Sequence, residues 1–259
     1  MNRQSRRILI MLVVIGSFAA TMLLPPVLQD PAYHAFADQR AFFGISRFFD
    51  IVTNLPFLII GIAGLLLGFR DGISGAWRSW TVFFAGVALV GIGSAYYHTD
   101  PTDLRLVWDR MPMTVGFMGV LVAVLTERVS ERIETYALMP AVLAGMLSVF
   151  WWSQTGDLRP YIWIQLLPLI VIPMLLLLYL GEKTGDRLIM LSLMCYVIAK
   201  VGEIGDQTLY MATGQVISGH SFKHLAAAAG CAVLLVMVQR REYACLETEA
   251  VHFDTISVK

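Results

Sequence analysis

Eight long apolar segments, separated by short charged stretches, restrict this chain to one class of fold. A helix of about 20 apolar residues crosses the hydrocarbon core of a membrane. The segments are apolar on all sides, and 15% of the residues are charged, against about 25% in soluble proteins. The sequence therefore predicts an all-α, polytopic bundle of membrane helices, with spans near residues 8–29, 48–69, 77–98, 105–126, 136–153, 159–181, 187–205 and 219–239.

Basic residues predict how the bundle is oriented. They gather in every second connection and at both ends of the chain, which the positive-inside rule places in the cytoplasm. These residues are Arg3, Arg6, Arg7, Arg70, Arg78, Arg128, Arg132, Lys183, Arg187, Arg240 and Arg241. A smaller group lies on the opposite side, near acidic residues: Arg40, Arg47, Arg105, Arg110 and Arg159. The bias is moderate, and it predicts that both termini are cytoplasmic.

The chain divides into three parts. We expect residues 1–30 to form an N-terminal membrane helix, residues 31–241 the main bundle and residues 242–259 a flexible cytoplasmic tail. A basic start followed by an apolar stretch is also typical of a cleaved signal peptide. No small-residue cleavage site is obvious after Leu24, so we favour a retained helix. Cleavage would leave the orientation of the other seven spans unchanged.

The sequence indicates neither a disulfide bond nor a nucleic-acid partner. Cys195 and Cys231 lie inside predicted spans and Cys245 lies in the tail, so none faces the oxidising side and no disulfide is expected. The formal net charge is zero and there is no basic cluster, so nucleic acid is not an expected partner. The sequence does not indicate an oligomeric state.

Three of the five histidines are predicted to lie at the same end of their spans. His98 ends the third span, while His220 and His224 open the eighth and share one helix face. Ser94 lies one turn before His98, and Asp109 lies one to two turns inside the fourth span. Histidine at membrane depth is costly without a partner, and three histidines with an open fourth position are the ligands of a catalytic zinc. The pattern predicts a zinc site with a serine and an aspartate beside it.

Each of these residues also has a simpler explanation. A His-x3-His pair occurs on many helices that bind nothing, and His98 alone would suit an interfacial position at a helix end. Asp109 alone would suit an ion pair with Arg105 or Arg110. Ser94 alone would suit close packing of two helices. The common depth of the five residues favours the metal site, because the other two histidines lie in a loop and in the tail.

The order and spacing of these residues resemble the alkaline ceramidase family. The motifs are Gly-x-Gly-Ser-x3-His at 91–98, Asp-x2-Pro-Met at 109–113 and Gly-His-x3-His at 219–224. The resemblance extends from about residue 38 to residue 239. This family belongs to a wider superfamily of seven-span hydrolases that includes the adiponectin-type receptors. The resemblance implies a seven-span core with one extra N-terminal helix, in a bacterial-type member that we expect in an inner membrane.

The resemblance also implies a role for each residue. His98, His220 and His224 would bind Zn²⁺ near the outer face. Asp109 would hold and deprotonate the attacking water, and Ser94 would stabilise the oxyanion. We therefore expect a zinc-dependent amidase that cleaves an N-acyl lipid of the bilayer into fatty acid and amine. The sequence does not identify the head group of that lipid.

The stretch before the second span departs from the family pattern. In eukaryotic alkaline ceramidases an acidic, tryptophan-containing stretch binds calcium there, whereas here Arg47 stands where an acidic ligand would be expected. Asp38 and Asp50 are candidate oxygen ligands, but two carboxylates are too few to predict a calcium site. We expect Asn54 to hydrogen-bond between helices instead of binding a metal.

Charged residues near the end of the seventh span leave two interpretations open. Asp206 resembles an acidic residue that precedes the histidine pair in the family, and it would orient a histidine ring nitrogen. The alternative is a plain ion pair between Lys200 and Glu203 in this region.

One alternative function also stays open. A receptor-like or lipid-sensing protein would use the zinc only structurally. Asp109 separates the two functions, because a structural site needs no carboxylate beside an open metal position. A transporter is not indicated, since no pair of broken helices surrounds a midplane site.

Overall fold

The computed structural model describes residues 1–68, 75–181 and 185–257, with side chains as far as Arg241. Arg70 and Lys183, used above to orient the bundle, lie outside these residues, as do the side chains of Cys245 and His252. The described residues form helices joined by loops and turns, and no strand is present among them. The prediction of an all-α helical bundle is confirmed.

Most of the helices follow one another with short connections, and the longest described connection is residues 24–47. In chain order they are α1 (Arg3–Leu23), the 3-10 turn η1 (Pro31–His34), α2 (Phe48–Val52), α3 (Leu55–Gly68), α4 (Trp77–Thr99), α5 (Asp103–Arg128), α6 (Arg132–Thr155), α7 (Arg159–Leu178), α8 (Asp186–Ile204), α9 (Asp206–Ala212) and α10 (Gly219–Ser257). The backbone of the predicted tail continues α10 as far as Ser257. Its flexibility stays a prediction.

Seven helical stretches are long and apolar enough to cross a membrane, with α2 and α3 together forming one of them. Only in combination with α9, which is bent by 83° from it, does α8 qualify as an eighth. The reason lies in its charges, since Asp186 and Arg187 lie at one end and Lys200 and Glu203 near the other. This set of helices supports a multi-pass membrane protein.

Two prolines explain where the first span differs from its predicted range. The prediction ended at residue 29, whereas α1 ends at Leu23. Pro25 and Pro26 follow directly, and a residue before proline is disfavoured in the helical conformation. In the second span, Pro56 lies in the first turn of α3, just after the break at Thr53 and Asn54.

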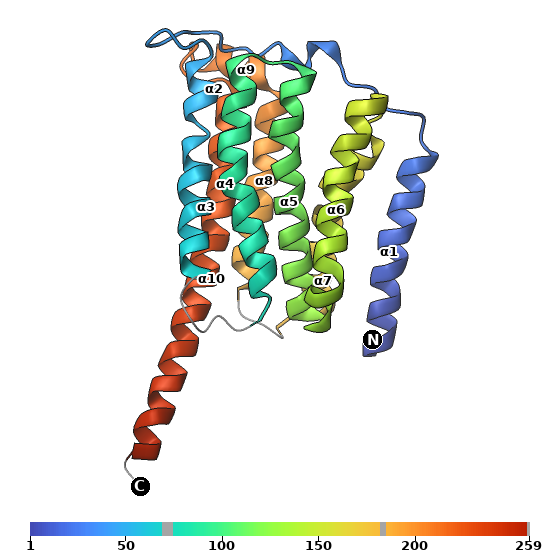
Figure 1. Ribbon diagram of the computed structural model, residues 1–259, viewed down its shortest axis with the longest axis vertical. Coiled ribbons are helices and arrows are strands. Elements are labelled where there is room, and N and C mark those ends of the chain that lie inside the picture. The colour runs from blue at the N-terminus through green and yellow to red at the C-terminus, as the bar shows by residue number, and fades with distance from the viewer. Residues whose placement is uncertain (69–74, 182–184, 258–259) are drawn as a thin grey trace.

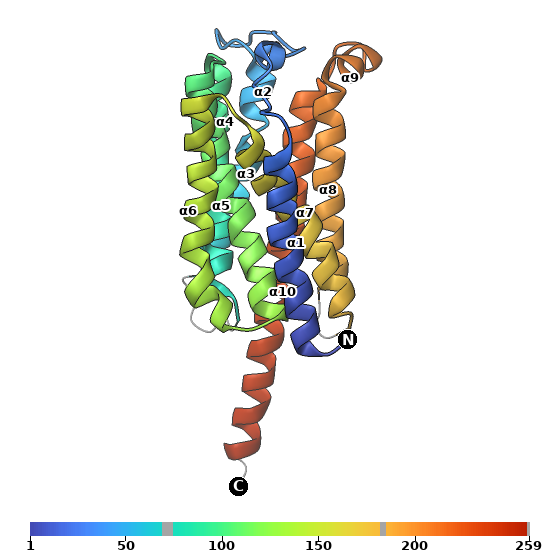
Figure 2. The same ribbon diagram turned by 90° about the vertical axis from the view of Figure 1, so that its right-hand side faces the viewer.

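The long helices stand side by side (Figures 1 and 2). The N-terminus and the projecting end of α10 lie at the same end of the bundle, which we call the terminus end. We call the opposite end the histidine end, because His98 lies there in the last turn of α4, and His220 in the first turn of α10.

Helix α1 is peripheral. It packs along α7, where Phe18 contacts Trp163 edge-on and Nε1 of Trp163 donates a 3.1 Å hydrogen bond to Ser17. Only 6% of its span is buried, compared with 61% for α5. The extra helix therefore contributes little to the centre of the bundle.

Glycines bring the central helices into close contact. A Cβ atom at Gly93 of α4 would lie 2.0 Å from the carbonyl oxygen of Trp108 on α5. A Cβ atom at Gly219, the first residue of α10, would lie 2.1 Å from the carbonyl oxygen of Gly202 on α8. Small residues permit such approaches between membrane helices. Both glycines adjoin predicted site residues, so they set the distances within the site.

Candidate metal centre

The three predicted histidine ligands meet in one buried place. His98 lies on α4, and His220 and His224 lie one turn apart on α10. Their relative exposures are 1%, 3% and 3%, so water does not solvate them. The pairwise distances between ring centroids are 4.8, 4.8 and 5.1 Å. The predicted cluster therefore exists, across two helices more than 120 residues apart in the chain.

The nitrogen positions suit a metal ion. One ring nitrogen from each histidine lies within 4.8 Å of the other two. Nε2 of His98 and Nε2 of His220 are 3.1 Å apart. Two nitrogens bound to one tetrahedral zinc at 2.0–2.1 Å would be about 3.3 Å apart. The closest pair thus needs only a small adjustment to share an ion.

The donor set also fits zinc chemically. Imidazole nitrogen is a preferred zinc ligand, and three such ligands leave one coordination position open. Among the described residues, no carboxylate lies within salt-bridge distance of these three rings, and the clustering of their nitrogens is the feature that they share. Nδ1 of His98 is buried without a hydrogen-bond partner. The arrangement of the three rings is compatible with a shared metal ion.

The ring of His224 is held by the break between α2 and α3. Oγ1 of Thr53 lies 3.0 Å from Nδ1 of His224, and it donates to the carbonyl oxygen of Phe49. The same oxygen is then free to accept from Nδ1–H of His224. Such a contact leaves the Nε2 lone pair available to a metal. Nδ2 of Asn54 donates a 2.7 Å hydrogen bond to the carbonyl oxygen of Asp50 and lies 3.4 Å from Nδ1 of His224, so a hydrogen bond from Asn54 to another long helix stays a prediction.

Asp206 positions the backbone of His220, not its ring. Its Oδ1 accepts a 2.8 Å hydrogen bond from the backbone N–H of His220, and its Oδ2 accepts from Ala37. The predicted ion pair between Lys200 and Glu203 is also present, and Lys223 joins it at 2.9 Å. The ion pair between Lys200 and Glu203 is therefore present, and Asp206 contacts the backbone of His220 and not its ring nitrogen.

Asp109 lines the same cavity as His224 and is not paired with Arg105 or Arg110. It is buried on α5, and the Ser94 side chain of α4 faces the same cavity. Arg105 pairs with Asp100, and Arg110 donates to Gln29. Neither arginine forms a salt bridge with Asp109, so the simpler explanation of this aspartate does not apply. A buried carboxylate facing a cavity suits proton transfer.

Arg47 fastens the end of α4. Its Nε donates a 3.0 Å hydrogen bond to the carbonyl oxygen of His98, and its Nη2 donates one of the same length to Thr99. A cation at a helix C-terminus also interacts favourably with the helix dipole. Arg47, which stands where an acidic residue was expected, therefore helps to position His98.

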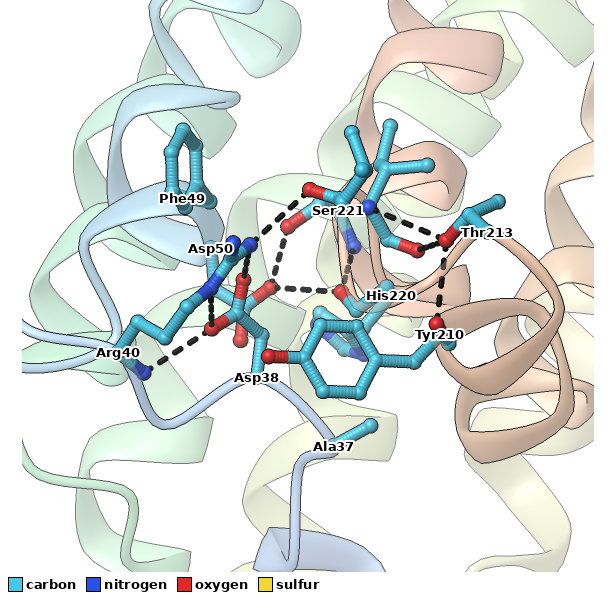
Figure 3. A network of polar contacts seen from close by, with 12 residues as sticks. Ala37, Asp38, Arg40, Phe49, Asp50, Tyr210, Thr213, His220 and Ser221 are labelled. Atoms are coloured by element: carbon cyan, nitrogen blue, oxygen red, sulfur yellow. Dashed lines mark hydrogen bonds and ion pairs between the residues drawn. The ribbon is translucent and has the colours of Figure 1, made fainter.

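The two candidate calcium ligands are engaged with other groups (Figure 3). Asp38 forms two hydrogen bonds with the guanidinium of Arg40, which also donates to the carbonyl of Val216. Burial raises the pKa of Asp38, but the hydrogen bonds from Arg40 outweigh it and hold the pKa below its usual value. Oδ1 of Asp50 accepts a 2.7 Å hydrogen bond from the hydroxyl of Ser221, whereas its Oδ2 is buried without a hydrogen-bond partner among the described residues. Arg40 thus supplies the positive charge beside Asp38.

A polar cavity of about 180 Å³ adjoins the histidines. A single water needs only about 10–15 Å³. We call this cavity the chamber, and its lining includes Tyr33, Ser94, Asp109, Arg110, Tyr161, Gln165, Tyr196, Lys200, Glu203, Lys223 and His224. It has room for part of a substrate next to the reacting groups.

An apolar cavity continues from the chamber into the bundle. The two share six lining residues, among them Phe57, Met113 and Tyr196. Farther in, the walls are formed by residues such as Ile172 and Leu234. The arrangement suits a molecule with a polar group beside the histidines and a hydrocarbon chain between the helices.

Several site residues escaped the sequence analysis. Thr53 directly precedes Asn54, which the sequence did single out, but no motif marks the threonine. Lys223 lies between His220 and His224, at a position where the motif specifies no residue type. Tyr33 lies in a loop and reaches Glu203 on α8, a contact that no spacing rule predicts.

Comparison with known proteins gives one family. The model of the family described as Ceramidase matches residues 40–256, which includes the histidines, Ser94 and Asp109 and leaves out α1. Comparisons with curated proteins and with solved structures gave no match. The match covers most of the chain and agrees with the motifs read from the sequence. The chain belongs to the ceramidase family.

Proposed function

We propose that this protein is a zinc-dependent hydrolase that cleaves an N-acyl lipid within a membrane into fatty acid and amine. Membership of the ceramidase family supports a lipid amide hydrolase. One observation carries the finer assignment: three buried imidazoles converge next to a buried carboxylate on the wall of a cavity with an apolar extension. A structural zinc site would need neither the carboxylate nor the cavity.

The residues have separate tasks in amide hydrolysis. Bound at His98, His220 and His224, zinc would supply a water of lowered pKa and polarise the amide carbonyl. Asp109 takes the proton of the attacking water and returns it to the departing nitrogen. The water oxygen bonds to the carbonyl carbon, the C–N bond breaks, and a fatty acid and an amine result.

Ser94 and the cavities complete the proposed site. The hydroxyl of Ser94 donates a hydrogen bond to the oxyanion that develops on the carbonyl oxygen. The apolar cavity holds an acyl chain, which fixes the amide next to Asp109. Thr53 and Arg47 keep His224 and His98 in position. No specific observation favours the receptor-like alternative.

Metal removal tests this function. Purified protein in detergent should release fatty acid from a defined mixture of N-acyl lipids. Treatment with a zinc chelator should abolish the release, and added Zn²⁺ should restore it, while Ca²⁺ alone should not. Unchanged release in the chelated protein, with zinc absent by elemental analysis, would overturn the metal-dependent mechanism.

The orientation is part of the proposal. The histidine end would face the outside and the terminus end the cytoplasm, as the basic residues predict. In a variant without its own cysteines, Leu104→Cys at the histidine end should react with an impermeant thiol reagent added to intact cells, and Ser130→Cys at the terminus end should not. The reverse labelling pattern would place the site on the cytoplasmic face.

A further inference from the structure

The chamber carries more positive than negative side chains. Three cationic residues line it, Arg110, Lys200 and Lys223, and two acidic residues, Asp109 and Glu203. Nζ of Lys223 lies 2.9 Å from Glu203, and Lys200 pairs with the same carboxylate. One acid therefore serves two lysines. A bound divalent metal would add to the positive charge.

Of the three chamber cations, Arg110 is the one with a buried nitrogen that has no hydrogen-bond partner among the described residues. It is 4% exposed, and its Nη2 donates a 2.6 Å hydrogen bond to the side chain of Gln29. Its Nη1 is buried and has no hydrogen-bond partner in the part of the chain that the structure describes. A buried polar group without a partner is costly, and an arginine fork is suited to bind an anion. Arg110 is therefore prepared for a ligand that the chain itself does not supply.

Aromatic rings hold the guanidinium of Arg110 in place. Its Cζ lies 4.1 Å from the ring centroid of Trp152, 4.9 Å from that of Tyr161 and 5.3 Å from that of Tyr33. These rings come from α6, α7 and η1, so three separate elements surround the group. Cation–π contacts stabilise the charge without using its N–H donors. The N–H donors of Arg110 therefore stay available for a ligand, and the rings fix the orientation of its guanidinium.

We propose that the chamber binds an anionic group on the amine half of the lipid amide, and that Arg110 is the residue that selects it. This inference rests on the proposed function, since the amide must lie between Asp109 and the histidines. Arg110 directly follows Asp109 on α5 and lines the same chamber. A carboxylate or phosphate there would meet the free Nη1 of Arg110. It would also balance the excess positive charge, with Lys223 nearby.

Three lipids with the same acyl chain test the proposal. N-palmitoylglycine carries a carboxylate where N-palmitoylethanolamine carries a hydroxymethyl group, and the phosphate ester of the latter carries a phosphate. Wild-type protein should cleave at least one of the two anionic lipids with kcat/KM about tenfold or more above the neutral one. The better anionic lipid identifies the anion. Equal or better cleavage of the neutral lipid would overturn the proposal.

Arg110→Gln sharpens the test. It should lower kcat/KM for the favoured anionic lipid by about 10- to 100-fold and that for the neutral lipid by less than about threefold. Arg110→Lys should recover part of the difference, because it keeps the charge but loses the fork. Arg105→Gln is the matched control, since this arginine lies on the same helix and pairs outside the chamber with Asp100. An equal loss on both lipids would assign Arg110 a purely structural role.

A binding measurement separates this inference from the proposed function. Equilibrium binding of the three lipids to wild-type protein and to Arg110→Gln needs no turnover. A preference for an anionic lipid that disappears in Arg110→Gln supports the inference even where no lipid is cleaved, in which case only the proposed hydrolysis fails. Equal binding of all three lipids would overturn the inference and leave the proposed function standing.

Discussion

Two groups of buried polar side chains, one at each end of the bundle, are partnered in different ways. At the terminus end, Arg128 pairs with Asp186, and Glu127 accepts 2.8 Å hydrogen bonds from Trp80 and from Arg241. Each of these contacts joins two helices through opposite charges or a donor and an acceptor. At the histidine end, three imidazoles face one another instead of facing acids.

We expect the paired side chains at the terminus end to contribute to stability and the clustered histidines to contribute to catalysis. Paired charges at the terminus end lower the cost of burying polar groups and connect α4, α5, α8 and α10. The convergent nitrogens of the histidine end do not satisfy one another, so they are explained by a ligand that they share. Substitutions at the two ends should therefore affect different measurements.

The largest effect is expected from the metal ligands. His224→Ala should reduce bound zinc from about one per chain to almost none, because a site with three protein ligands does not tolerate the loss of one. Elemental analysis of the purified variant measures this. His34→Ala is the matched control, since His34 contacts Tyr97 and Asp103 outside the cluster. A variant with alanine at all three ligand positions that still carried stoichiometric zinc would disprove the site.

The next largest effect is expected from the proposed base. Asp109→Asn keeps the shape of the side chain but removes its ability to accept a proton. Turnover of an N-acyl lipid should fall by about 10²- to 10⁴-fold, the usual contribution of a general base, while the zinc content stays the same. Asp103→Asn, at the exposed start of the same helix, should leave turnover unchanged. Wild-type turnover in Asp109→Asn would remove Asp109 from the mechanism.

A smaller loss is expected from the oxyanion donor. Ser94→Ala should lower turnover by about 10- to 100-fold, less than Asp109→Asn, because a water or a backbone N–H can substitute for one hydroxyl donor. Ser148→Ala is the control: this serine is also buried, but it bonds only to the carbonyl of Gly145 in its own helix. Equal losses in the two variants would mean that the effect is one of packing.

Spacing within a helix made part of the site predictable from the sequence. Residues four apart share a face, which is why the sequence paired Ser94 with His98 and His220 with His224. In the structure the three histidines converge and Ser94 lines the chamber, while the role of each residue stays a prediction. Apolar length predicted the helices, although proline ended the first one earlier than expected. The depth of Asp109 was predicted from its distance to the start of its span. All these inferences use local geometry alone.

The contacts between distant segments were not predictable in this way. Thr53 and His224 are 171 positions apart, and their contact depends on the break at Thr53 and Asn54 and on how α10 packs against it. The bend between α8 and α9, which brings Asp206 to the backbone of His220, follows no apolar period. Loop residues such as Arg47 carry no periodic signal at all. Such contacts are fixed by tertiary packing, which one sequence does not encode in a readable pattern.

The smallest effect on chemistry is expected at the terminus end. Glu127→Gln keeps the size of the side chain but removes the charge that faces Arg241 and weakens the acceptor of the Trp80 N–H. Stability should fall by about 1–2 kcal/mol, as for other hydrogen bonds to charged groups, and the melting temperature in detergent by several degrees. Zinc content and turnover below the melting temperature should equal those of the wild type, because this pair lies at the opposite end of the bundle from the histidines. A loss of zinc or of turnover without a change in melting temperature would show that the two ends are coupled, and the separation of stability from chemistry would then be wrong.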